Sequence, residues 1–133
     1  MRSPAIAAAV LALLAPSTAA AGAGSHPFAT RLAVHGYRLE LRVAPNRATV
    51  SANATLVLTK QGHAVNGARV RLTYVMLDMP MTGIVRALAP RGRGRYADAG
   101  PVLGMSGRWG LTVRVAPLHE SPFTVRLVDR MSA

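Results

Sequence analysis

The strongest constraint on the fold of this chain is an alternation of apolar and polar residues with a period of two. In the segment 37–43, YRLELRV, apolar side chains occupy the odd positions, and arginine or glutamate occupies the even ones. The segment 107–115, GRWGLTVRV, repeats this alternation, with Trp109 and Leu111 on its apolar side. Successive side chains of a β-strand point to opposite faces, so the pattern is typical of a half-buried strand in an antiparallel sheet.

Other segments with strand character lie between turn signals rich in glycine, proline and asparagine. No segment after the first two dozen residues has a convincing helical pattern. Short strands separated by such turns are typical of an all-β sandwich. We therefore expect an immunoglobulin-like antiparallel β-sandwich of about seven strands, located at 37–43, 53–60, 68–76, 84–88, around Tyr96, at 107–115 and at 123–128.

The N-terminal region has the composition of an export signal. Arg2 precedes the apolar run AIAAAVLALLA, and a tail of small residues follows it. The run is shorter than the roughly 20 apolar residues that a membrane-spanning helix needs. We expect a cleaved secretory signal peptide over 1–23 and a periplasmic or secreted protein, with an uncleaved signal anchor as the alternative. The remainder is expected to comprise a loose segment, 24–36, and one sandwich domain, 37–133.

Composition narrows the classes of function. The chain has no cysteine, so burial and hydrogen bonding must hold the fold without disulfides. It has 16 Lys and Arg residues against 5 Asp and Glu residues, which indicates an acidic partner, an anionic membrane surface, or simply an arginine-rich proteome. Aromatic residues are few and no recognition helix is expected, so nucleic acid is not a predicted partner.

Enzymatic activity is not expected either. No serine lies in a nucleophile-elbow motif, and no thiol is available as a nucleophile. The closest set of polar residues, His119, Ser121 and Asp129, has no supporting spacing. No small-molecule substrate is indicated.

Four motifs follow one another in the second half of the chain. They are a G-x-x-V-x-G-A-x-V hairpin from Gly62, a methionine–proline segment at 79–81, a G-x-G-x-Y turn that ends at Tyr96, and a G-x-W-x-L-x-V strand from Gly107. Their order resembles the YtkA-like domain, a bacterial extracytoplasmic β-sandwich family. FixH-like and CopC-like domains are its neighbours in architecture. The resemblance implies an accessory role in copper handling or oxidase assembly, although a fold alone does not fix a function.

The methionines are the candidate metal ligands. Met79 and Met81 flank a proline in the stretch YVMLDMPMTG, and Met105 lies in a second expected loop. Neutral thioether sulfur suits Cu(I), whereas Cu(II) and Zn(II) prefer imidazole or carboxylate ligands. Met79, Met81 and Met105, with His63 from the hairpin loop, are therefore the predicted copper ligands. Met76 continues an inward-facing alternation and is expected in the core, and Trp109 and Tyr96 are expected there as aromatic anchors.

Two interpretations of the methionine segment remain open. In the first, the protein binds Cu(I) and works with a copper-handling partner or in metalloenzyme assembly. In the second, it is a metal-free interaction module whose methionines form an apolar contact with a membrane protein. Many relatives carry a histidine soon after the methionine–proline segment, whereas TGIVRAL follows here, so a mixed site for Cu(II) is not expected.

Overall fold

The alternating segments form β-strands in the computed structural model, which describes residues 26–133. The predicted signal peptide, 1–23, lies outside the described residues. Within residues 26–133 there is no helix, and hence none long and apolar enough to cross a membrane. The strands are β1 (Phe28–Val34), β2 (Tyr37–Ala44), β3 (Asn53–Lys60), β4 (His63–Ala64), β5 (Arg69–Met76), β6 (Ile84–Gly92), β7 (Arg95–Asp98), β8 (Gly107–Ala116) and β9 (Phe123–Met131).

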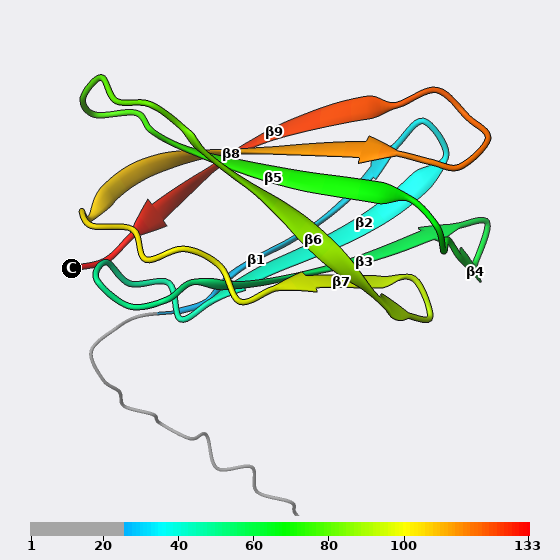
Figure 1. Cartoon of the computed structure of the whole chain (residues 1–133), viewed down its shortest axis with the longest axis horizontal. Helices are drawn as coiled ribbons and strands as arrows, with labels where there is room; N and C mark the ends of the chain where they lie inside the picture. Colours follow the sequence, from blue (N-terminus) through cyan, green and yellow to red (C-terminus); the bar gives the residue numbers. More distant parts are fainter. Residues whose placement is uncertain (1–25) are drawn as a thin grey trace, which may run out of the picture.

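The strands form two antiparallel layers that face each other (Figure 1). One layer contains β1, β2, β3 and β7, with the short β4 added to β3, and the other contains β5, β8 and β9. Strand β6 joins the layers, because residues 84–88 pair with β5 whereas residues 89–92 pair with β7. The register is irregular between Pro90 and Gly92, as expected for a proline within a strand. The all-β antiparallel sandwich predicted from the sequence is confirmed.

Three hairpins are closed by two-residue turns that end in glycine. Both residues of each turn have positive φ angles, which gives the backbone a twist that matches the twist of the strands it joins. Glycine adopts this conformation without steric cost, so the three dipeptides fix where neighbouring strands reverse. The turns are His35–Gly36, Gln61–Gly62 and Arg93–Gly94.

The hydrophobic core lies between the two layers and consists of the inward side of the alternating pattern. Trp109 and Tyr96, which the sequence predicts as core residues, are each 1% exposed, and Met76 is also buried, as expected. Each fully buried large apolar side chain contributes about 1.5–3 kcal/mol relative to an exposed one. Burial of this alternating set is thus what holds the cysteine-free sandwich together.

Tyr96 also contributes a polar connection inside the fold. Its hydroxyl donates a hydrogen bond to the carbonyl oxygen of Val65 over 2.7 Å and accepts one from the backbone N–H of Ala68 over 3.1 Å. This side chain from β7 therefore fixes the segment that leads from β4 into β5. The hydroxyl of Tyr74, in contrast, is buried without a hydrogen-bond partner among the described residues.

Two elements differ from the sequence prediction. The segment 24–36, predicted to be loose, contains strand β1, which pairs with β2 along its whole length. Its inward side is only half buried and includes Thr30, so the apolar alternation is weaker than in β2. Strand β4 has two exposed residues, too few to give any periodic signal. These two strands raise the number from about seven to nine.

The two buried tyrosines provide a matched test of the polar connection. We expect Tyr96→Phe to lower the free energy of unfolding by about 1–3 kcal/mol, because the backbone N–H of Ala68 and the carbonyl oxygen of Val65 lose their shared partner. Tyr74→Phe should cost less than about 1 kcal/mol, since its hydroxyl has no partner to lose. Urea denaturation of both variants gives the comparison. Equal losses would contradict the role assigned to the Tyr96 hydroxyl.

Candidate functional site

The loop that follows β5 lies against the start of β8 at one end of the sandwich, and an ion pair holds the two together. The loop from β5 to β6 covers residues 77–83, and a second loop leads from β7 into β8. The backbone N–H of Leu77 donates to the carbonyl oxygen of Arg108 over 2.9 Å. The Asp78 carboxylate accepts the Arg108 backbone N–H over 2.9 Å and also pairs with the Arg108 guanidinium, with an Nη2–Oδ1 distance of 2.8 Å. We call this set of contacts the Asp78–Arg108 clamp.

The clamp affects the titration of its carboxylate. The hydrogen bond from the Arg108 backbone N–H is the main cause that lowers the pKa of Asp78 below its ordinary value, and the hydrogen bond from the guanidinium adds to it. Both donors favour the ionised form of the carboxylate. Asp78 therefore stays charged throughout the neutral and mildly acidic range.

The clamp brings the three predicted methionine ligands to the same end of the molecule. Met79 and Met81 follow Asp78 directly in the first loop, and Met105 lies three residues before Arg108 in the second. The carbonyl oxygen of Met105 accepts a 2.9 Å hydrogen bond from the indole N–H of the buried Trp109, which fixes the backbone there. All three side chains are accessible to solvent, with exposed fractions of 45%, 44% and 37% for Met79, Met81 and Met105.

His63 does not belong with these methionines. It lies in β4, at the end of the sandwich where β5 begins, whereas Met79 and Met81 follow the end of β5. Figure 1 shows β4 and the β5–β6 loop at opposite ends of the molecule. A strand of eight residues covers about 25 Å. The prediction that His63 completes the methionine set is therefore wrong. Only β5 and short loops separate His63 from Met79 in the sequence, but the length of that strand holds the two residues far apart.

The donor atoms at this end favour a soft metal ion. Within residues 26–133, no group of three or more His, Cys, Asp or Glu side chains comes close enough together to hold a metal. Asp78, the carboxylate within the β5–β6 loop, is engaged by Arg108. Exposed thioethers remain, and thioether sulfur is a ligand that suits Cu(I). The chemistry of the donor set therefore fits Cu(I) better than Cu(II) or Zn(II).

Sequence analysis missed the clamp and an apolar surface beside it. Leu77 lies across Gly110, where a Cβ atom on the glycine would come within 3.2 Å of the leucine Cδ2 atom. Val85 and Val128 continue this apolar surface and are 58% and 59% exposed. Val128 was the signal in the sequence for this apolar surface, because it occupies an outward position of an alternating strand, where a polar residue is usual.

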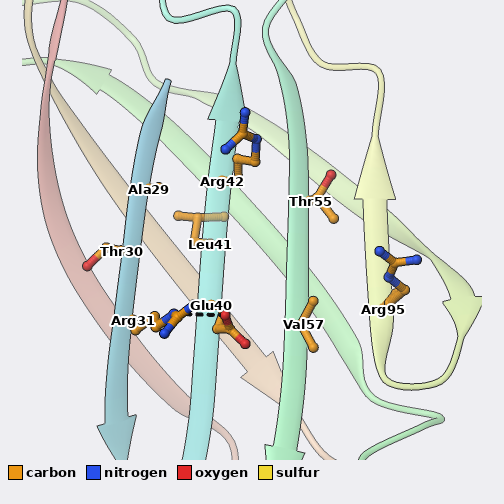
Figure 2. Close-up of a pocket in the computed structure, with 9 residues that line it drawn as sticks. All are labelled: Ala29, Thr30, Arg31, Glu40, Leu41, Arg42, Thr55, Val57 and Arg95. Carbon is orange, nitrogen blue, oxygen red and sulfur yellow. Dashed lines mark ion pairs between the residues drawn. The ribbon is translucent and has the colours of Figure 1, made fainter. Parts of the chain in front are cut away.

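A second feature is a broad hollow of about 760 Å³ on the outer face of the other layer (Figure 2). Arg31 and Glu40 form a 3.0 Å ion pair across β1 and β2 at one side of it. Arg42 and Arg95 lie on either side of β3, with Thr55 between them, as Figure 2 shows. Among the residues that line the hollow, Glu40 is the one carboxylate, and it is already paired. This arrangement can attract anions, but it offers no nucleophile and base in contact.

Comparison with known families agrees with the fold and the motif order. The chain matches the YtkA-like family over residues 31–114, a range that begins within β1 and ends within β8. The chain therefore belongs to the YtkA-like family. No curated protein and no solved structure gives a significant match.

Titration of the clamp can be measured directly. Because its folded pKa is lowered, Asp78 contributes stability that is present above the unfolded pKa and is lost as the pH falls through the folded value. The NMR signal of the Arg108 amide should therefore titrate with a midpoint below that of an unperturbed aspartate. In Asp78→Asn this titration should disappear, and the Leu77 amide should exchange faster with solvent. A midpoint at or above the ordinary value would contradict the clamp.

Proposed function

We propose that this YtkA-like protein is an accessory binding protein that holds Cu(I) through thioether sulfur at the loop end of the sandwich. Met79, Met81 and Met105 are the proposed ligands. The observation that carries the proposal is the Asp78–Arg108 clamp, which fixes the loop that bears Met79 and Met81 against the start of β8, three residues after Met105, while the three methionines stay exposed. The methionine composition of the loops and the family membership also support it.

An exposed site of this kind suits transfer of the metal better than permanent storage. A partner can approach ligands that lie on the rim, and neutral thioethers are displaced without a change in protonation. Unlike imidazole or thiolate, a thioether binds no proton in the physiological range, so affinity should vary little between pH 5 and pH 7.5. The chain's own residues position and present the metal, and no reaction is proposed.

The cellular setting is part of the same proposal. Export to the periplasm or outside the cell follows from the predicted signal peptide, 1–23. There the protein would exchange Cu(I) with a copper-handling protein or deliver it during assembly of a metalloenzyme such as an oxidase. The family membership is what supports this setting.

Titration with Cu(I) against a competing chelator tests the proposal. We expect the wild-type protein to bind one Cu(I), and Met79→Leu/Met81→Leu to weaken binding on the order of 100-fold or more, because leucine keeps the apolar volume and removes the soft donors. Met105→Leu should produce a smaller loss in the same direction. The affinity should be nearly independent of pH over the range given above.

A second double variant provides the matched control. Met76→Leu/Met131→Leu also removes two thioethers, but both of these methionines are buried in the core, with exposed fractions of 5% and 4%. This control should retain the wild-type affinity. Equal losses in the two double variants, or no Cu(I) binding by the wild-type protein, would overturn the proposed copper site.

A second candidate function is a metal-free interaction module that docks on a membrane protein. The observation in its favour is the apolar surface formed by Leu77, Val85 and Val128 beside the exposed methionines. In this alternative Met79 and Met81 would act as adaptable apolar contacts, a known use of methionine at binding surfaces. Absence of Cu(I) binding by a correctly folded wild-type protein would favour this function.

A further inference from the structure

The outer face of the layer formed by β5, β8 and β9 carries a group of arginines without an acidic partner. Arg71 lies directly opposite Arg114 in the β5–β8 register, and Arg69 is on the same side of β5, opposite Ala116. These four residues line a shallow hollow of about 180 Å³. Like charges directly opposite one another destabilise a sheet. We call Arg69, Arg71 and Arg114 the arginine cluster.

Every carboxylate side chain of the protein is engaged elsewhere. The chain has five Asp and Glu residues, and the sheet pairs an arginine with a carboxylate where one is present, as with Arg31 opposite Glu40 in the β1–β2 register. The remaining four carboxylates contact other residues, in the pairs Asp78–Arg108, Asp98–Arg86, Glu120–Lys60 and Asp129–Asn46. The charge of the arginine cluster is therefore not neutralised within the protein, and an external anion is the group that would neutralise it.

Toward the loop end, the same outer face carries exposed valines among further arginines. Thr73 and Thr112 are opposite each other next to the cluster, and Gly110 follows, opposite Val128 of β9. Val85, opposite Thr73 in β6, and Val128 are both more than half exposed. Arg114 lies four residue steps along β8 from Gly110, which corresponds to about 13 Å. Arg126 and Arg130 flank Val128 on the exposed side of β9, so guanidinium groups and valines are interspersed on one sheet face.

We propose that this outer face docks on an anionic phospholipid bilayer. The guanidinium groups of Arg71 and Arg114 would bind headgroup phosphates, and Val85 and Val128 would contact the interfacial region next to them. Arginine recognises phosphate through paired hydrogen bonds, and a hollow of about 180 Å³ accommodates a single phosphate group. A bilayer presents phosphate groups and apolar surface close together, as this face presents arginines and exposed valines, and it requires no shape-matched cleft. This docking is independent of the proposed copper site.

Vesicle binding tests the proposal. The protein is used from residue 24 onward, because all nine strands and every core residue lie within that part and the apolar run near the N-terminus would bind membranes by itself. Cooperative unfolding in urea first establishes that each variant is folded. Binding is then measured by co-sedimentation with vesicles of phosphatidylcholine alone and with vesicles that contain phosphatidylglycerol. The wild-type protein should bind the anionic vesicles, and this binding should weaken with added salt. It should not bind the vesicles of phosphatidylcholine alone.

Two double variants that remove the same amount of charge distinguish binding by this face from attraction by the net charge of the protein. Arg71→Gln/Arg114→Gln should weaken binding to the anionic vesicles on the order of 10- to 30-fold. Arg42→Gln/Arg95→Gln removes the same charge from the outer face of the opposite layer and should leave binding within about twofold. Equal losses in the two variants would mean that net charge alone drives the attraction and would overturn the proposal.

Further measurements test the contact of the valines and whether the partner of this face is a lipid bilayer or an acidic protein. Val85→Ser/Val128→Ser should also weaken vesicle binding, whereas an unchanged affinity would overturn the proposed contact of the valines with the bilayer. Binding to polyglutamate without binding to anionic vesicles would indicate an acidic protein partner and overturn the lipid assignment. None of these variants alters Met79, Met81 or Met105, so the Cu(I) affinity should stay at the wild-type value in all of them. Failure of vesicle binding therefore leaves the copper proposal intact, and the reverse also holds.

Discussion

Burial of one side of each alternating strand between two layers is the interaction on which the rest of this structure depends. The protein has no cysteine, so no covalent link holds the layers together. Trp109, Tyr74 and Tyr96 are the largest fully buried side chains, and strand β6 carries the backbone from one layer to the other. Because the inward positions are committed to the core, the outward positions and the loops are the places where functional residues can vary.

The loop end shows how this arrangement can position a site without a rigid helix or a disulfide. Strands β5 and β8 are neighbours in register, so the residues that follow β5 and those that begin β8 must lie close together. The Asp78–Arg108 clamp uses this proximity and fixes the loop that carries Met79 and Met81. The proposed copper chemistry therefore rests on a constraint that the sheet itself imposes, and the side chains at the rim supply only the donors.

The distribution of charge gives the two outer faces different properties. Around the broad hollow of the β1–β2–β3–β7 layer, Arg31 is paired with Glu40, whereas the β5–β8 pair places Arg71 against Arg114. The protein thus places two arginines opposite each other on one outer face, whereas on the other outer face an arginine lies opposite a carboxylate. A requirement for an anionic surface gives that difference a physical reason, since a bilayer would supply the missing countercharge. A composition-wide excess of arginine gives no reason for it.

The sequence by itself determined the all-β class, seven of the nine strands, the burial of Met76, Tyr96 and Trp109, and the family. These follow from period-two alternation and local turn chemistry, which are properties of neighbouring residues. Strands β1 and β4 were not predicted, because the inward side of β1 is only half buried and β4 has only two residues.

Only the tertiary structure decided which distant residues meet. It placed Met105 at the same end as Met79 and Met81, separated His63 from them by the length of β5, and set Arg71 opposite Arg114. Such juxtapositions depend on strand order and register between segments far apart in the chain, and local periodicity carries no information about either.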